Sequence, residues 1–340
     1  RCRAGLGSVV SGGYGNRVVM MRVLVTGATG FVGRHVCPAI IGAGHEVSAA
    51  VRRPDHPNIS PGASYHVVPD IGPETEWGKA LSGIDAVVHL AARVHIINED
   101  IPDPLFEYCR VNADGTASLA KAATGAGVRR FVFLSTVKVM GERTTARPFV
   151  ETDTPKPEGA YGLSKWAAEK ALMEAAGQGR LEPIILRPPL IYGPGVGGNF
   201  LSLLELCQKA PPLPLMTVNN RRSFLYVGNL ADAVLRCLNP DNEVSGQTYF
   251  VRDGEDLSTP ALIRHVGRVL GRPALLFPAP KILVRLAGLL TGKSEAVHRL
   301  LDSLQMDDEK IRRQLGWTPP WDVVQGLKET AVWFTSGKRV

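Results

Sequence analysis

The stretch TGATGFVG, residues 26–33, follows the apolar run RVLV and leads directly into a helical pattern. Three glycines, Gly27, Gly30 and Gly33, are spaced three apart in it. Glycines at this spacing let the backbone turn tightly, approach a pyrophosphate closely and pack a helix on the preceding strand. A helix N-terminus adds unpaired amides and a partial positive charge. An ordinary tight turn would explain the glycines alone, but strand, loop and helix together predict dinucleotide binding.

On the C-terminal side of this stretch, short β-branched runs alternate with longer helical patterns. The first helix is expected to end near Gly42, and another is expected at about residues 105–125. Strands are predicted for HEVSAAV (45–51), YHVV (65–68), DAVVHLAA (85–92) and RFVFLST (130–136). Alternation of this kind indicates a parallel sheet with helices on both faces. The predicted fold class is α/β, a Rossmann-type doubly wound parallel sheet with a smaller, discontinuous C-terminal substrate lobe.

The second lobe is predicted from a change of pattern after Tyr192, where proline- and glycine-rich loops and amphipathic helices begin. Two later stretches, SFLYVGNLADAVLRCL and GQTYFVRD, predict strand and helix that return to the sheet. We therefore expect a dinucleotide-binding domain at residues 21–190, joined by 223–254. The substrate lobe is expected to consist of residues 191–222 and 255–335.

The composition is that of an ordinary globular chain, with 340 residues and 44% hydrophobic content. Residues 1–20 carry three arginines and no acid, which leaves +4 of the net charge of +7 for the rest. This scattered excess suits a pocket for anionic ligands better than a groove for nucleic acid, so no nucleic-acid partner is expected. Residues 1–20 are also glycine-rich and lack the apolar core of a signal peptide, so we expect a disordered tail.

No membrane span and no metal site are expected. The most apolar late segment, 274–290, is interrupted by Pro278, Pro280, Lys281 and Arg285. It therefore cannot supply the roughly 20 apolar residues that cross a bilayer. The five cysteines are widely spaced, without a C-x-x-C pair or a nearby histidine cluster. This argues against a disulfide framework and against zinc, and favours a reducing cytoplasm.

The choice of cofactor is predicted from the end of the second strand. An acid about 20 residues past the glycines would bind the ribose of NAD, whereas a basic residue would accommodate the 2′-phosphate of NADP. This chain has Arg52 and Arg53 there. Two solvated arginines at a strand end, with Asp55 reaching the ribose, are the alternative. We favour NADP and keep NAD open.

Tyr161 and Lys165 form a Y-x-x-x-K pair, YGLSK. On a helix this spacing stacks both side chains on one face. A neighbouring ammonium stabilises a phenolate and is expected to lower the pKa of the tyrosine, which makes a proton shuttle. The pair alone is common on surface helices. It gains weight because it follows a strand that ends in Ser135 and Thr136, whose hydroxyls can hold a substrate oxygen.

These residues resemble the extended short-chain dehydrogenase/reductases, in particular the nucleotide-sugar epimerases, reductases and dehydratases. The resemblance runs from Met21 to about Trp333. It rests on TGATGFVG, on the pair Asp70-Ile71, on HLAA at 89–92, on N-x-x-G-T at 112–116, on YGLSK, on LRPPLIYGPG at 186–195, on RRSFLYV at 221–227 and on LGWTP at 315–319.

The resemblance implies that Tyr161 is the catalytic acid/base, that Lys165 holds the nicotinamide ribose and that Thr136, rather than Ser135, bonds the sugar oxygen. With the arginines above, the predicted cofactor-binding set is Gly27, Gly30, Phe31, Val32, Gly33, Arg52, Arg53, Asp70, Ile71, Leu90, Ala91, Ala92, Asn112, Tyr161, Lys165 and Pro188. The predicted substrate-binding set is Thr136, Lys138, Asn199, Phe200, Leu213, Leu215, Arg222 and Arg299. For Leu213 and Leu215 a PPLPL loop without ligand is the alternative, and the local match at Arg299 is poor.

Val137 and Lys138 argue against loss of water. In the sugar 4,6-dehydratases of the family an aspartate and a glutamate hold these two positions and expel the C6 hydroxyl. Valine cannot transfer a proton, and lysine with its ordinary pKa of about 10.4 has the wrong charge for a base. Lys138 is either a solvated strand-end charge or a contact to a substrate oxygen.

Three candidate functions are compatible with these residues. The first is reduction of a UDP-4-keto-6-deoxy-N-acetylhexosamine by NADPH, because STVKVMGE, NNRRSFLYV and GEDLST look most like the 4-ketoreductases that form UDP-N-acetylquinovosamine for surface polysaccharide. The second is a UDP-glucose 4-epimerase with retained NAD. The third is an NADP-sensing regulator without chemistry, which would not need Thr136, Tyr161 and Lys165. The resemblance also implies a homodimer through the helices at about 105–126 and 161–177.

Overall fold

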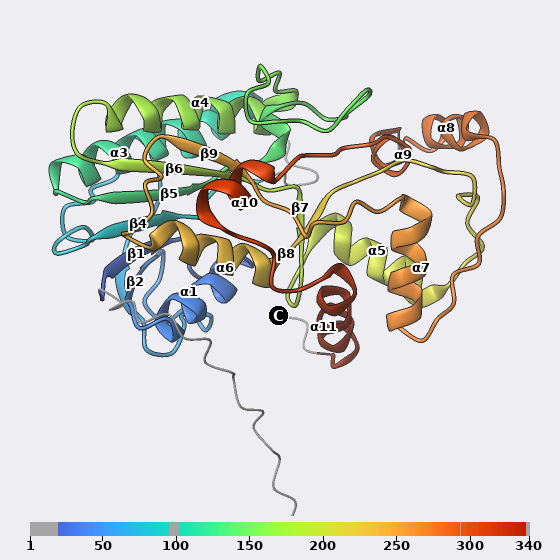
Figure 1. Ribbon diagram of the computed structural model, residues 1–340, viewed down its shortest axis with the longest axis horizontal. Helices are drawn as coiled ribbons and strands as arrows, with labels where there is room; N and C mark the ends of the chain where they lie inside the picture. Colours follow the sequence, from blue (N-terminus) through green and yellow to red (C-terminus); the bar gives the residue numbers. More distant parts are fainter. Residues whose placement is uncertain (1–19, 95–101, 293, 338–340) are drawn as a thin grey trace, which may run out of the picture.

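The computed structural model of the chain describes residues 20–94, 102–292 and 294–337 (Figure 1). The tail predicted for residues 1–20 lies outside the described residues, except for Met20. Figure 1 shows two parts side by side, a layered sheet with helices on both faces and a looser group of helices beyond β7 and β8.

The larger part is built on a parallel sheet that has seven strands among the described residues. In spatial order they are β3 (Ser64–Val67), β2 (Glu46–Val51), β1 (Arg22–Thr26), β4 (Ala86–His89), β5 (Arg130–Leu134), β6 (Glu182–Arg187) and β9 (Gln247–Phe250). The chain moves outward from β1 first through β2 and β3, and then in the other direction through β4, β5 and β6. This order confirms the predicted Rossmann-type, doubly wound fold. Ligands of such sheets bind where the direction reverses, at the carboxyl ends of β1 and β4.

Both faces of the sheet are buried, as parallel strands require. Along β1, Val23 and Val25 belong to one hydrophobic cluster and Leu24 to the other, which is the two-residue period of a strand. Helices α1 (Gly33–Gly42) and α6 (Val227–Leu238) cover the first face. Helices α3 (Gly115–Gly125) and α4 (Gly159–Ala176) cover the second.

The helix predicted at about residues 105–125 is one continuous helical segment with a change of winding. It consists of α2 (Pro104–Cys109), a π-helical turn at Arg110–Asp114 and α3. Asp103 caps its start, because its carboxylate accepts a hydrogen bond from the amide of Phe106 at 3.0 Å.

The smaller part contains β7 (Leu190–Tyr192), α5 (Gly198–Lys209), β8 (Phe224–Tyr226), α7 (Thr259–Val269), α8 (Lys281–Leu290), α9 (Ser294–Leu301) and α11 (Val323–Thr335). The prediction that SFLYVGNLADAVLRCL returns to the main sheet was wrong in part. Its helix, α6, packs on α1, but its strand, β8, pairs with β7 in a separate two-stranded sheet. Pro188 and Pro189 directly follow β6 and have no N–H to donate, so the ladder is interrupted before β7 begins.

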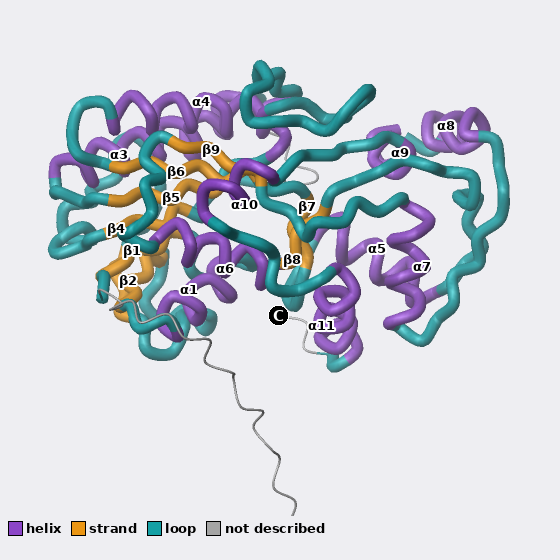
Figure 2. The backbone as a smooth tube through the Cα atoms, viewed as in Figure 1, coloured by secondary structure: helices purple, strands orange, loops and turns teal. Residues whose placement is uncertain are grey.

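Helix α10 (Glu309–Leu315) lies against the main sheet although its neighbours in sequence belong to the smaller part. Ile311, Leu315 and Trp317 join the cluster that covers the α1 face. Figure 2 shows the chain crossing between the two parts in loops. The lobe boundaries named above stay a prediction. None of the helices described here is long and apolar enough to cross a membrane.

Candidate active site

The glycine loop between β1 and α1 is closed to larger side chains. Gly27 has a φ of +68°, and a Cβ there would stand 2.8 Å from the amide nitrogen of Ala91. A Cβ on Gly33 would stand 2.3 Å from the carbonyl oxygen of Gly27. No side chain caps the start of α1 at Val32. A tight turn followed by an uncapped helix start fits the diphosphate of a nicotinamide dinucleotide, which supplies the hydride chemistry when bound.

His89 links three of the sequence motifs through buried hydrogen bonds. Its Nδ1 lies 2.6 Å from the hydroxyl of Thr26, and its Nε2 lies 3.0 Å from the hydroxyl of Thr116. The Thr116 hydroxyl donates its proton to the carbonyl oxygen of Asn112 at 2.6 Å, so Nε2 must be the protonated nitrogen. Burial lowers the pKa of His89 to about 3, which keeps the ring neutral. This role of His89 was missed, because a lone histidine in a strand carries no motif of its own.

Asn112 joins the loop after β4 to the catalytic helix. Its side-chain amide donates to the carbonyl oxygen of Arg93 at 3.0 Å and to the hydroxyl of Ser164 at 2.9 Å, and its oxygen accepts from the Arg93 amide at 2.7 Å. It lies in the π-helical turn, a feature frequent at functional sites. Ala91 and Ala92 lie half-buried in the same loop, beside Leu90, whose amide donates to the carbonyl oxygen of Thr26.

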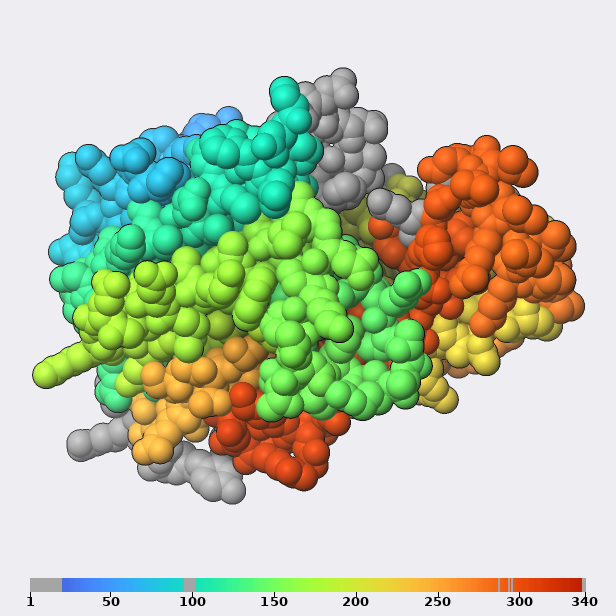
Figure 3. All heavy atoms as spheres, turned by 90° about the horizontal axis from the view of Figure 1, so that it is seen from above, coloured from blue at the N-terminus to red at the C-terminus, as the bar shows by residue number. Residues whose placement is uncertain are grey.

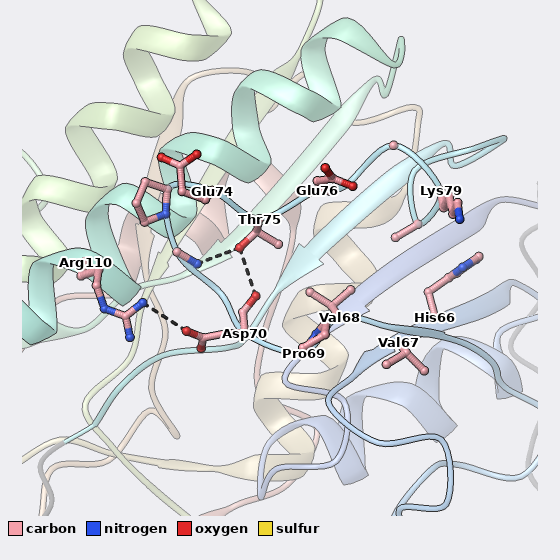
Figure 4. A pocket seen from close by; sticks show the side chains of 14 residues that line it. His66, Val67, Val68, Pro69, Asp70, Glu74, Thr75, Glu76, Lys79 and Arg110 are labelled. Atoms are coloured by element: carbon pink, nitrogen blue, oxygen red, sulfur yellow. Dashed lines mark hydrogen bonds and ion pairs between the residues drawn. The ribbon is translucent and has the colours of Figure 1, made fainter.

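Arg52 and Arg53 are both exposed at the end of β2. Asp70 lies three residues beyond the end of β3, the strand next to β2, and its carboxylate pairs with Arg110 at 3.1 Å. Asp70 and Arg110 line a pocket of about 870 Å³ together with residues 66–69, 72–76 and 78–80, and Figure 4 shows how these side chains lie. Neither Thr136 nor Tyr161 lines this pocket.

Tyr161 lies in the first turn of α4 and is half-buried, with its ring edge-on to that of Tyr108 at 6.3 Å between centroids. Burial, with a smaller contribution from Tyr108, raises the pKa of Tyr161 to about 12. The expectation that the ammonium of Lys165 lowers this pKa was wrong for the structure as described, because loss of water around the phenol outweighs it. Tyr161 is therefore a protonated phenol at neutral pH.

Lys165 is fully buried one turn further along α4. Its Nζ lies 3.9 Å from the centroid of the Phe133 ring. Burial lowers the pKa of Lys165 to about 7, and the carboxylate of Glu169 acts in the opposite direction. A lysine with a pKa near neutrality is only partly charged, which explains why it does not offset the desolvation of Tyr161.

Thr136 and Ser135 differ in what their hydroxyls do. The Ser135 hydroxyl donates to the carboxylate of Glu169 at 2.5 Å and is buried with it. Thr136 stands at the start of a 3-10 turn, Val137–Val139, and accepts a hydrogen bond of 3.3 Å from the Lys138 amide. Its own proton stays available, in agreement with Thr136 as the predicted partner of a substrate oxygen. The start of α4 packs on this turn, since a Cβ on Gly162 would stand 3.1 Å from the Lys138 carbonyl oxygen.

A buried ion pair beneath the catalytic helix was missed in the sequence. Arg187 at the end of β6 donates two hydrogen bonds to the Glu169 carboxylate, at 3.0 and 2.5 Å. Its remaining N–H contact is with the sulfur of Met140 at 3.1 Å. With Ser135, the pair connects β5, α4 and β6. The signal was an acid one helical turn after Lys165, Glu169, and an arginine directly after the apolar run IIL, Arg187.

Two of the predicted substrate residues, Lys138 and Arg222, interact with Glu142, and Arg299 lies near Arg222. Lys138 Nζ pairs with the Glu142 carboxylate at 2.9 Å, so Lys138 is not a free strand-end charge. Burial lowers the pKa of Arg222. The carboxylates of Glu142 and Asp302 act to raise this pKa, and the charge of Arg299 acts to lower it further. The Arg222 guanidinium also donates to the carbonyl oxygen of Asp302 at 2.9 Å. A half-buried cluster with three cations and Glu142 suits a diphosphate.

The other predicted substrate residues are placed less directly. Asn199 is exposed in the first turn of α5, whereas Phe200 is buried and stacks on Tyr192 with centroids 5.1 Å apart. Leu213 is half-buried and pairs with Leu276, and Leu215 is buried in the core of the smaller part. Pro188 and Ile71 belong to the predicted cofactor-binding set, and the Pro188 carbonyl oxygen accepts from the Val137 amide at 2.9 Å. The ligand contacts of all these residues stay predictions.

A doubly wound sheet, a glycine loop before an uncapped helix, and a Tyr-x-x-x-Lys helix beside a free threonine hydroxyl define a dehydrogenase-type enzyme. The model of the NAD dependent epimerase/dehydratase family matches residues 23–251. The chain belongs to this family and is an enzyme of it, which sets aside the regulatory alternative.

Two curated relatives cover almost the whole chain. A UDP-glucose 4-epimerase of Vibrio cholerae is 38% identical over 320 residues, which span 93% of this chain and 96% of that protein. An N-acetyl-alpha-D-glucosaminyl-diphospho-ditrans,octacis-undecaprenol 4-epimerase of Escherichia coli O157:H7 is 29% identical over 327 residues, 91% of this chain and 93% of that one. Among solved structures, MoeE5 in complex with UDP-glucuronic acid and NAD is similar with a TM-score of 0.73, 26% identity and coverage of 93% and 99%.

Proposed function

We propose that the protein is an NAD(P)-dependent oxidoreductase acting at C4 of a UDP-sugar, and that it reduces a UDP-4-keto-6-deoxy-N-acetylhexosamine for surface polysaccharide synthesis. The observation that carries this proposal is the position of Tyr161 in the first turn of the helix that packs against the Thr136 turn. A phenol that keeps its proton at neutral pH is a general acid, which is the group that reduction of a carbonyl requires.

Each residue of the site has a task in this reaction. The Thr136 hydroxyl donates a hydrogen bond to the C4 oxygen, and Tyr161 gives its proton to that oxygen as negative charge develops on it. Lys165 orients the nicotinamide ribose. Arg222 and Arg299 hold the diphosphate of the substrate with charge-assisted hydrogen bonds. Val137 is buried and Lys138 is paired with Glu142, so neither supplies the acid or the base that loss of water would need.

NADPH is the proposed cofactor because Arg52 and Arg53 are exposed where a 2′-phosphate would lie. A cell keeps NADPH largely reduced, so selecting it suits an enzyme that delivers hydride and releases the cofactor. The homodimer and the cytoplasmic location also remain part of the proposal.

A 4-epimerase with retained NAD is the second candidate, and the 38% identical relative favours it. The name of the other epimerase relative gives a substrate whose sugar is attached to a lipid diphosphate instead of a nucleotide. Both carriers contain a diphosphate, so the cluster around Arg222 would serve either of them.

The experiment compares the two reactions in the purified protein. For a reductase, a UDP-4-keto-6-deoxy-N-acetylhexosamine causes stoichiometric loss of the NADPH absorbance at about 340 nm, and the protein arrives without bound nucleotide. If the protein instead retains NAD through gel filtration and interconverts UDP-glucose and UDP-galactose without added cofactor, the reductase proposal fails and the epimerase replaces it.

A further inference from the structure

Helix α8 exposes a row of large apolar side chains at the outer end of the smaller part (Figure 1). The five residues are more exposed than an apolar helix face in a globular protein usually is, with Leu290 at 86%. They are Ile282, Leu283, Leu286, Leu289 and Leu290.

The apolar row lies on the side of α8 that faces away from the rest of the protein. At about 100° per residue, the five side chains occupy an arc of roughly 120°. Val284 and Gly288 lie on the opposite side, where Val284 packs on the core of the smaller part and Gly288 lies against Val297. α8 therefore has two apolar sides: Val284 and Gly288 pack against the protein, and the five exposed residues form a separate face.

The segment that leads into α8 extends the same apolar surface. Leu275 and Phe277 are exposed, and so is Met216, whose amide donates to the carbonyl oxygen of Phe277 at 3.2 Å. Figures 2 and 3 show this loop and α8 together at the end of the molecule, away from the sheet and its helices. We call α8 with Leu275, Phe277 and Met216 the α8 surface.

The segment that carries the α8 surface is basic, and Asp302 lies beside it as the ion-pair partner of Arg285. Between residues 257 and 294 the sequence contains six lysines and arginines and no aspartate or glutamate. Two of the six, Arg285 and then Lys281, lie along one edge of the apolar arc. Arg285 is half-exposed although it pairs with Asp302 at 3.5 Å, and Lys281 donates to the side chain of the exposed Asn219. An apolar arc edged with cations matches a lipid surface with anionic head groups.

We propose that the α8 surface lies on an anionic membrane, with α8 parallel to the bilayer plane and its leucines in the boundary between head groups and acyl chains. At ten residues α8 is too short to span. A second copy of the chain is a poorer occupant, because a two-fold contact between two α8 surfaces would bring their cations together, and of Lys281 and Arg285 only Arg285 has an acidic partner among the described residues, Asp302. The proposal does not depend on the reaction that the enzyme catalyses.

The test uses the full chain and sedimentation with vesicles, either phosphatidylcholine alone or mixed with phosphatidylglycerol. The variant is Leu286→Glu with Leu290→Glu, and the matched control is Val332→Glu, an exposed position on α11. Wild type and control bind the anionic vesicles and lose binding at high salt, and the variant binds at least about tenfold more weakly. The single variant Leu290→Glu, at the most exposed of these positions, provides the same comparison if the double variant does not fold.

Two outcomes overturn the proposal. One is that the α8 variants bind anionic vesicles as well as the control does, or that wild type binds phosphatidylcholine alone equally well. The other is that the protein binds no vesicles, and that light scattering finds a changed oligomeric state in the α8 variants but not in Val332→Glu. That result would assign the α8 surface to a second copy.

Discussion

Tyr161 is the residue whose surroundings constrain the chemistry most. Its phenol is held protonated by burial, and the hydroxyl of Thr136 accepts a hydrogen bond from the Lys138 amide but donates none to the described part of the protein. The hydroxyl of Ser135, one residue earlier, is bonded to Glu169. Two adjacent hydroxyl residues at one strand end therefore have different tasks, and only Thr136 has a proton to offer the substrate.

Replacing Tyr161 with Phe removes the proton donor and leaves the ring. We expect turnover to fall by about two to four orders of magnitude, the usual range for losing a general acid. Cofactor binding, measured by fluorescence titration, should be unchanged. Turnover close to that of wild type would remove Tyr161 from the mechanism.

Replacing Glu169 with Gln tests the buried ion pair. The guanidinium of Arg187 would lose its counter-charge in a site where both side chains are almost fully buried, so unfolding free energy should fall by about 3–5 kcal/mol. The double variant Glu169→Gln with Arg187→Met should recover part of that loss, because it removes the unpaired guanidinium and leaves only the charge of Lys165 without the Glu169 carboxylate. Urea denaturation measures both, with Glu46→Gln in the exposed Arg22–Glu46 pair as the control, where little change is expected. A single and a double variant of equal stability would mean that the two side chains are not coupled.

Lys165 makes stability depend on pH. Its pKa is lowered to about 7 in the folded protein and is about 10.4 in an unfolded chain. Between these values the unfolded state binds more protons, so unfolding free energy rises with pH. The destabilisation is therefore full below about pH 7 and is relieved as pH increases toward about 10.4. In Lys165→Met this rise should be absent, which denaturation of both proteins at about pH 7 and about pH 9.5 will show. Parallel pH profiles would contradict the lowered pKa.

At this scale the Tyr-x-x-x-Lys pair could be found in the sequence, its catalytic role stays a prediction, and the buried residues around it were missed. Tyr161 and Lys165 are four apart on one helix, so their pairing is local and readable. His89, Glu169 and Arg187 act through partners that only the fold brings near. The direction of the Tyr161 pKa was also predicted wrongly, because the extent of burial is not visible in a sequence.

Among the elements, the end of β2 carries a prediction about cofactor choice. Arg52 and Arg53 are exposed there. Changing both to Ala should weaken NADPH binding by at least about tenfold, since a charge-assisted hydrogen bond contributes roughly 1.5–3 kcal/mol, and should leave NADH binding nearly unchanged. Calorimetric titration with each cofactor measures the ratio. Equal losses for both cofactors would show that the arginines do not contact a 2′-phosphate.

Most strands of the main sheet were predictable, and those between the lobes were not. β1, β2, β4 and β5 are short apolar runs next to a helical pattern, which is the signal of a buried parallel strand, whereas β3 has mostly exposed side chains and β6 was not predicted. β7 and β8 have three residues each, and their pairing depends on where the two prolines after β6 interrupt the ladder. Helix α10 was missed as part of the sheet face because its seven residues follow a stretch that belongs to the smaller part.

On the scale of the whole molecule, the outer face of α2 and α4 is the surface we expect to form the homodimer. Leu105, Phe106, Leu163 and Met173 are exposed on it. Phe106→Asp should convert a dimer into a monomer, measured by light scattering at micromolar concentration. Phe277→Asp on the α8 surface is the matched control and should leave the dimer intact. A wild-type monomer, or a dimer that only Phe277→Asp disrupts, would contradict the assignment.

The position of β9 has a consequence for synthesis of the chain. β9 completes the sheet by pairing with β6, yet about 60 residues separate the two strands, and they include β7, α5, β8 and α6. Until residue 250 has left the ribosome, β6 is an open edge whose N–H and C=O groups have no partner on that side. A nascent chain that stalls in this interval presents a flat, apolar strand to other chains, which is when aggregation is most favoured.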